Sequence, residues 1–196
     1  MSGFTHLHVH TVYSLLDGAS KIPALVSRAK ELGMDSIAIT DHGVMYGVID
    51  FYKECTKQGI KPILGMEAYV APASLYDREG VREYNHLILL AKNQIGYKNL
   101  MKLSSIAFVD GFYYKPRIDY DILEKYHEGI ICLSACLAGS IPQALLNGRY
   151  DDAHALALRL KRVFGDDFYI ELQNHGLPEQ LEGLPCLLYT SPSPRD

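Results

Sequence analysis

The segment His-Leu-His-Val-His at residues 6–10 constrains this chain more than any other stretch, because its histidines alternate with apolar residues. In an extended strand His6, His8 and His10 share one face, and the two residues between them point to the other face. Imidazoles bury poorly unless each nitrogen finds a hydrogen-bond partner or a metal ion. Asp17 follows within reach of such an ion, so the segment predicts a metal site of imidazole and carboxylate.

Length and composition place the chain among soluble globular proteins of ordinary charge. It has 196 residues, 48% of them hydrophobic, and a formal net charge of -4. An acidic chain has no electrostatic footprint for nucleic acid, so DNA contacts must be local or made by other sequence. No signal peptide or membrane-spanning run is visible, which predicts a cytoplasmic protein without membrane contact. The four cysteines form no CxxC pair and are expected to be free thiols, with metal ligation open for one.

Short apolar runs alternate along the chain with helical patterns. Gly33 and Gly59 follow the first two helical patterns and are expected to end those helices. The alternation predicts parallel strands joined by crossover helices in an α/β fold, and it favours a β/α barrel over an open sheet. Strands are expected at residues 5–9, 36–40, 62–70, 86–91, 129–134 and 168–173, and helices at 22–32, 47–58, 97–108 and 150–164.

Metal-competent side chains recur close to the ends of these predicted strands. Packing alone would not require that coincidence. His86 is the exception, because it begins its run and reaches the same pocket only if the preceding loop returns to the end of the Glu67 strand. The candidates are His8, His10, Asp17, Asp41, His42, Glu67, His86 and Cys136.

Each candidate also has an ordinary structural interpretation. Asp41 could cap a helix or orient an imidazole, and Cys136 could be a small buried hydrophobic residue. His6 stays open between a ligand and an outer hydrogen-bond partner of one. The remaining histidines are interpreted as surface or core residues; these are His127, His154 and His175.

Long motifs in uninterrupted order, from about residue 6 to residue 180, carry a family resemblance. They are HLHVHTVYSLLDG, ITDHGVMYGVIDFY, GIKPILGMEAYV, NHLILLAKN, GFYYKPRID, LSACLAG and YIELQNHGLPEQ. Together they resemble the PHP (polymerase and histidinol phosphatase) domain in the N-terminal region of bacterial DNA polymerase III alpha subunits. The resemblance implies a distorted (β/α)7 barrel with up to three divalent ions at the carboxyl ends of its strands.

The same resemblance implies a ligand set and roles for its members. Asp17, Glu67 and His10 are the implied catalytic residues, and His6 and Asp41 are expected to support the ligands from outside. Zinc suits such mixed ligation best, with manganese or magnesium as alternatives. The implied metal ligands are His8, His10, Asp17, His42, Glu67, His86 and Cys136.

The end of the chain is expected to differ from the rest. Residues 186–196 read Cys-Leu-Leu-Tyr-Thr-Ser-Pro-Ser-Pro-Arg-Asp, and their codons can spell a transposase-type sequencing adapter, so we interpret them as an artefact. Residues 1–185 are then a PHP domain whose barrel is incomplete at its C-terminal end. The family's later Asp-x-His pair is not reached, and no polymerase active-site residue is present.

The implied function is a metal-dependent phosphoesterase, with 3'-5' exonuclease proofreading as the favoured activity, inside a subunit that carries out DNA-templated DNA synthesis. This fragment alone is not expected to polymerise. The implied partners are primer-template DNA, bound through the full-length subunit, and other holoenzyme subunits such as a proofreading subunit and the sliding clamp. The alternatives are a metal-stabilised module that docks partners, and a stand-alone phosphatase of the histidinol-phosphatase type.

Overall fold

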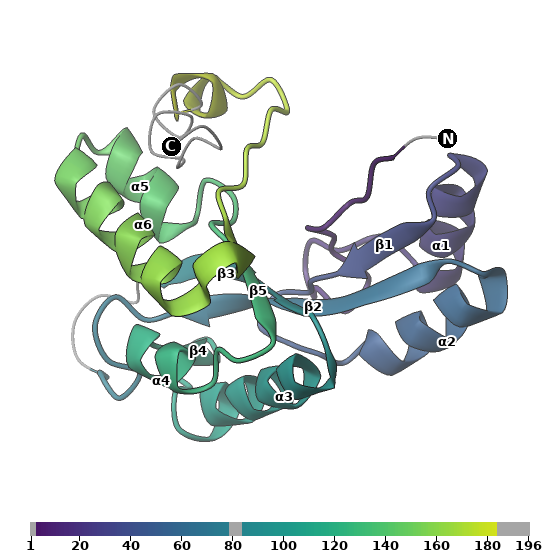
Figure 1. Cartoon of the computed structure of the whole chain (residues 1–196), viewed down its shortest axis with the longest axis horizontal. Coiled ribbons are helices and arrows are strands. Elements are labelled where there is room, and N and C mark those ends of the chain that lie inside the picture. The colour runs from purple at the N-terminus through teal and green to yellow at the C-terminus, as the bar shows by residue number, and fades with distance from the viewer. Residues whose placement is uncertain (1–2, 79–83, 184–196) are drawn as a thin grey trace.

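A computed structural model describes residues 3–78 and 84–183, which form helices around one mixed sheet (Figure 1). The sheet order is β1-β2-β3-β5-β6, and β4 pairs with β2 off this path. The strands are β1 (Ser36–Ile39), β2 (Lys61–Val70), β3 (Asn85–Ala91), β4 (Arg117–Ile118), β5 (Ile130–Leu133) and β6 (Phe168–Tyr169). The helices are α1 (Ile22–Glu31), α2 (Val48–Gln58), α3 (Gln94–Val109), α4 (Tyr120–Lys125), α5 (Ser140–Leu146), α6 (Tyr150–Phe164) and the 3-10 turn η1 (Gly165–Asp167).

The first part of the chain follows the predicted strand and helix alternation. β1 pairs in parallel with β2, with Ser36 opposite Lys61, and α2 makes the crossover between them. Gly33 and Gly59 have φ angles of 75° and 74°, the left-handed conformation that ends a helix and that glycine adopts without strain. The α/β class and these helix ends are therefore confirmed.

The expectation of uniformly parallel strands is wrong for β3. This strand is antiparallel to β2, with Glu67 opposite Ile88, and antiparallel to β5, with Leu89 opposite Cys132. No helix lies in the described residues between Val70 and Asn85, so this connection lacks the crossover that a parallel pair needs. The start of β3 consequently lies beside the end of β2.

Two predicted strands are shorter or less regular than expected. Residues 5–9 are not a regular strand, although Ala38 N donates to His6 O at 2.9 Å and Thr40 N to Val9 O at 2.9 Å. Three steps along this segment therefore match two along β1, and one extra residue interrupts the pairing as in a bulge. The last predicted strand, at residues 168–173, shrinks to the two residues of β6.

Two of the three hydrophobic clusters in the core pack strands against helices, and the third, around Ile88 and Leu133, lies on the opposite face of the sheet. One cluster packs β2, β3 and β5 against α3, α5 and α6, with Leu89, Leu100 and Leu160 at most 2% exposed. A second cluster packs β1 against α1 and α2 around Phe51. A cavity of about 890 Å³ is lined by residues 4–8 on one side and 169–175 on the other. The described strands form an open sheet, so closure of a seven-unit barrel stays a prediction.

Two other sequence predictions concern membrane contact and the end of the chain. Among the described residues, no helix is long and apolar enough to cross a membrane. The interpretation of residues 186–196 as an artefact falls outside the described residues. The short elements β4, α4 and α5 were not predicted, because each is at most seven residues long and shows too few turns for a helical or strand period.

We expect Gly96→Ala to destabilise the fold, although alanine favours helices. A methyl group at this position of α3 would collide with the backbone carbonyl of Gly129, so the helix would have to shift away from the start of β5. The free energy of unfolding in urea should fall by about 1–3 kcal/mol. Lys102→Ala, at an exposed position of the same helix, is the control. Equal stability of the two variants would contradict this account of the packing.

Candidate metal centre

The buried carboxylate of Glu67 is the centre of the candidate site. Its side chain is 1% exposed, and four imidazoles surround it. His8 Nε2 lies 2.7 Å and His10 Nε2 3.6 Å from Oε2, whereas His42 Nδ1 lies 2.5 Å and His86 Nδ1 2.8 Å from Oε1. Each carboxylate oxygen therefore faces its own pair of imidazoles.

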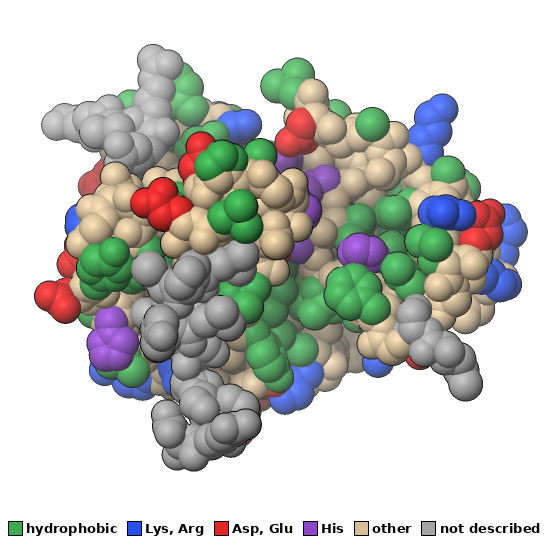
Figure 2. All heavy atoms as spheres, turned by 90° about the horizontal axis from the view of Figure 1, so that it is seen from above, with side chains coloured by type: hydrophobic (Ala, Val, Ile, Leu, Met, Phe, Trp, Pro, Cys, Tyr) green, Lys and Arg blue, Asp and Glu red, His purple; other side chains and the backbone are tan. Residues whose placement is uncertain are grey.

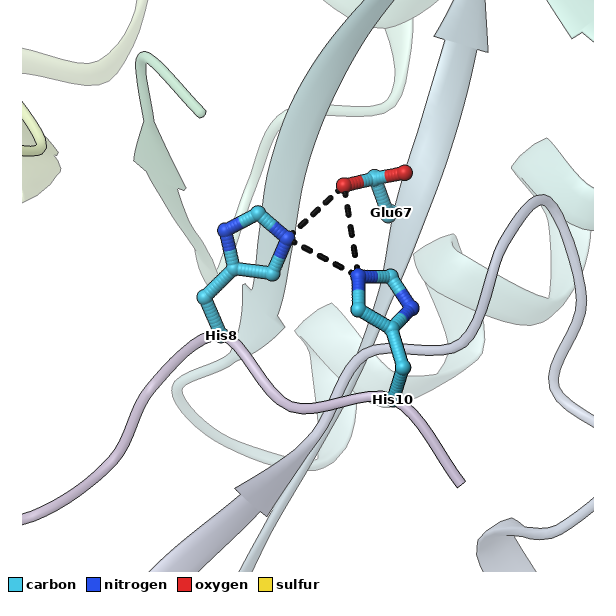
Figure 3. Close-up of side chains that lie close together, drawn as sticks. All are labelled: His8, His10 and Glu67. Atoms are coloured by element: carbon cyan, nitrogen blue, oxygen red, sulfur yellow. Dashed lines mark hydrogen bonds and ion pairs between the residues drawn. The ribbon is translucent and has the colours of Figure 1, made fainter. Parts of the chain in front are cut away.

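The ligand candidates come from segments that are far apart in the sequence. His8 and His10 point toward Glu67 from the irregular segment beside β1 (Figure 3). His42 follows β1, and the backbone ties this turn to β2, because Glu67 N donates to Asp41 O at 3.1 Å. Figure 2 shows histidine side chains gathered in a hollow at the middle of one face. The fold therefore assembles what four separate motifs contribute.

His86 reaches the site because β3 runs antiparallel to β2. Tyr69 lies opposite His86 in the sheet register, two residues beyond Glu67, and the two rings meet edge to face at 5.3 Å. The loop before β3 does return the chain to the end of the Glu67 strand, as the sequence required. A residue at the start of one strand and a residue near the end of another thus share one pocket.

Two groups of residues that share Glu67 could each hold one metal ion. The two groups are His8, His10 and Glu67, and His42, Glu67 and His86, and within each group the candidate ligand atoms lie within 4.8 Å of one another. Donor atoms about 2.1 Å from a tetrahedral ion lie about 3.4 Å apart, close to the spacings here. The rings of His10 and His42, one from each group, have centroids 4.0 Å apart. Imidazole and carboxylate donors in this arrangement suit divalent ions.

The electrostatics also favour cations. Burial opposes ionisation of Glu67, but hydrogen bonds from the four imidazoles outweigh it and hold the pKa of this carboxyl well below its usual range. Burial lowers the pKa of His8, yet hydrogen bonds to Glu171 and Glu67 outweigh burial and raise it to about 9. The hydrogen bond to Glu67 also raises the pKa of His42. Ions that bind here must displace these protons.

Asp17 and Cys136 lie at the border of the cluster. Asp17 Oδ2 is 2.8 Å from His42 Nε2, and its side chain is 63% exposed. The hydrogen bond to His42 lowers the pKa of Asp17. Cys136 Sγ lies 3.8 Å from His86 Nδ1, and burial raises the pKa of its thiol to about 11. Neither residue belongs to the two compact groups found among the described residues.

Asp41 supports His10 through a serine instead of capping a helix. Asp41 is buried and accepts hydrogen bonds from Thr11 N, Thr11 Oγ1 and Ser14 Oγ at 2.6 to 2.8 Å. Because Ser14 donates its only proton to Asp41, its oxygen accepts from His10 Nδ1 at 3.0 Å. Nδ1 of His10 therefore keeps its proton, and Nε2, which faces Glu67, is the nitrogen that would give up its proton to an ion.

The structure places the other histidines outside the cluster. His6 is exposed and its ring packs edge-on against Phe4, so the expected supporting contact is not seen. The bulge in the pairing of residues 6–9 with β1 breaks the strict alternation, so His6 does not share the face of His8. His127 Nδ1 bonds to Glu124 O, and His154 and His175 are exposed.

The sequence analysis missed Glu171, which lies 2.7 Å from His8. Glu171 lies inside the strand predicted at 168–173 but follows the observed β6 by two residues, so the overlong strand prediction concealed its place at a strand end.

Comparison with known proteins assigns the chain to a family. The PHP domain family matches residues 6–175, and the chain belongs to this family. It is 57% identical over 183 residues to DNA polymerase III subunit alpha of Borreliella burgdorferi, covering 91% of this chain and 16% of that protein. It is 52% identical over 189 residues to the subunit of the same name of Treponema pallidum, covering 94% and 16%. The chain therefore spans about one sixth of the length of these relatives.

A more distant likeness appears among solved structures. One described as a putative metal-dependent phosphoesterase from Bifidobacterium adolescentis has a TM-score of 0.44 and 15% identity, covering 95% of this chain and 84% of the other. This likeness is too weak to bear on the site.

We expect the two groups to bind ions separately. Equilibrium dialysis with Zn²⁺ should give at least two ions per chain. His8→Ala should lose one ion and His42→Ala a different one, whereas Glu67→Gln should weaken both because it contributes an oxygen to each group. His154→Ala, at an exposed position on α6, should bind like the wild type. A single ion in the wild type would contradict the bridged arrangement.

Asp41→Asn should weaken binding of the ion held by His10. Loss of an outer hydrogen-bond partner typically costs about 10–100-fold in metal affinity. Competition with a chromophoric chelator measures this affinity, and urea unfolding of the metal-free chain reports any general destabilisation. Asp151→Asn, at an exposed position on α6, is the matched control. Unchanged affinity in Asp41→Asn would show that Ser14 holds His10 without help.

Proposed function

We propose that this chain is the PHP region of a DNA polymerase III alpha subunit and that its cluster hydrolyses phosphodiester bonds as a 3'-5' exonuclease. The observation that carries the proposal is Glu67, whose two oxygens each face a separate pair of imidazoles. Two ions about 3.5–4 Å apart are the arrangement that stabilises both the attacking and the leaving oxygen of a phosphoryl transfer. The curated relatives support the polymerase context.

The chain's own residues would hold and orient the reacting groups. Divalent ions bound here would supply a water of lowered pKa and neutralise charge on the phosphate. Glu67 keeps its negative charge between the two imidazole pairs, because the low pKa leaves it ionised. The proton on His10 Nδ1 is held by Ser14, so that ring keeps one orientation. Asp17, exposed at the rim beside His42, is placed to exchange a proton with solvent or a leaving group.

The donor set favours zinc, with manganese or magnesium as alternatives at the oxygen-richer positions. The proposed partners are primer-template DNA, bound through the longer subunit, together with a proofreading subunit and the sliding clamp. These follow from the similarity to the relatives, of which this chain spans 16%. DNA synthesis itself is proposed for the longer protein.

One observation favours a second function, that of a metal-stabilised structural module. The four imidazoles come from three segments, at residues 8–10, 42 and 86, that lie 32 to 78 residues apart in the sequence. All four meet at a carboxylate that is 1% exposed. Ions at this place would join the N-terminal segment to β1, β2 and β3. The domain would then brace the polymerase and dock partners without cutting DNA.

Exonuclease assays on 5'-labelled single-stranded DNA test the proposal in the full-length subunit. Asp17→Ala and His10→Ala should each lower the rate of 3'-end removal by at least about 100-fold, because a proton-transfer group or a metal ligand is lost. DNA synthesis by the same preparations should persist. His154→Ala, purified in parallel, is the control for contaminating nucleases.

Removal of metal separates the two functions. Chelation should abolish hydrolysis, and Zn²⁺ or Mn²⁺ should restore it. If chelation lowers the melting temperature while no preparation ever removes a nucleotide, the domain is a structural module and the exonuclease proposal is wrong.

A further inference from the structure

Glu171 is a partly buried carboxylate that belongs to neither of the two groups of candidate ligands. It follows β6 by two residues, and its side chain is 13% exposed. Oε1 lies 2.7 Å from His8 Nδ1, on the side of the ring opposite to Glu67. Oε2 is buried and has no hydrogen-bond partner among the described residues. A buried carboxylate oxygen without a hydrogen-bond partner costs free energy of folding, so its presence here calls for an explanation.

The end of β5 holds Glu171 in place independently of His8. Glu171 N donates to Ser134 Oγ at 2.9 Å, and Ser134 N donates to Tyr169 O at 3.1 Å. The amide of Gln173 donates to Glu171 Oε1 at 2.6 Å, and the same nitrogen lies 3.2 Å from His8 Nδ1. Backbone and amide contacts therefore hold Glu171 in addition to its contact with His8.

The contact decides which nitrogen of His8 carries the proton. A carboxylate accepts and does not donate, so Nδ1 must carry the hydrogen of this bond. The other nitrogen, Nε2, lies 2.7 Å from Glu67 and 3.1 Å from His10, and it is the nitrogen that would give up its proton if an ion bound. Only a ring in this tautomer and orientation can offer Nε2 to an ion between these three residues.

We propose that Glu171 is a positioning residue that fixes the ring and tautomer of His8 for metal binding. The inference rests on the proposed metal centre and names a part of it that acts through His8. Both histidines of the group His8, His10 and Glu67 would then have a supporting carboxylate. Asp41 contacts His10 through Ser14, and Glu171 contacts His8 directly.

Zn²⁺ affinity, measured by chelator competition on the full chain, tests the inference. Glu171→Ala should bind one ion about 10–100-fold more weakly, with an unchanged number of ions per chain. Glu171→Gln, which keeps an acceptor of the same shape, should lie between Ala and the wild type. Glu179→Gln, exposed in the same C-terminal segment, is the control and should bind normally. Urea unfolding of the metal-free variants shows whether each remains folded.

A second variant separates positioning from general stability. A His8→Ala background is expected to lack this ion already. In that background Glu171→Ala should leave the affinity for the remaining ion unchanged, because there is no ring left to orient. An equal loss in both backgrounds, or wild-type affinity in Glu171→Ala, would overturn the inference. So would the loss of a whole ion in Glu171→Ala, which would make Glu171 a direct ligand. The measured quantity is Zn²⁺ affinity. A chain that binds Zn²⁺ but cuts no DNA would therefore contradict the proposed exonuclease activity without contradicting this inference.

Discussion

The pairing of the ionised Glu67 carboxylate, buried near the end of β2, with four imidazoles is the interaction on which the rest of the site depends. A charge in that place is tolerable only if it is paired and hydrogen-bonded, because an unpaired buried ion costs several kcal/mol. Four imidazoles meet the requirement, and they bring with them the N-terminal segment, the turn after β1 and the start of β3. Fold and site therefore share one electrostatic constraint, and divalent ions would satisfy it further.

The mixed sheet is what allows so many donors to meet at one carboxylate. A purely parallel sheet would align the carboxyl ends of its strands and leave the start of β3 at the opposite edge. The antiparallel pairing of β3 with β2 instead sets His86 opposite Tyr69, next to Glu67. The irregular segment beside β1 likewise brings His8 and His10 to Glu67, where both rings face the same oxygen, Oε2. Departures from ideal strand geometry are thus concentrated where the donors converge.

Behind the donors lies an outer layer of carboxylates. Asp41 acts on His10 through the hydroxyl of Ser14, and Glu171 contacts His8 directly. Both arrangements put the proton on Nδ1 and leave Nε2 for an ion. The supporting carboxylates follow strands at opposite ends of the strand order, Asp41 after β1 and Glu171 after β6. The geometry of the centre therefore depends on contacts that only the complete sheet brings together.

The sequence by itself determined the donor types, the α/β class and the ends of α1 and α2, because these depend on residue chemistry and local periodicity. Histidines with a carboxylate, and glycines after helical patterns, carry such information within a few residues. Only the tertiary structure decided the direction of β3, the exposure of His6 and the part taken by Glu171. Strand direction and burial arise from pairing between distant segments, and 163 residues separate Glu171 from His8. No local pattern encodes a contact across that distance.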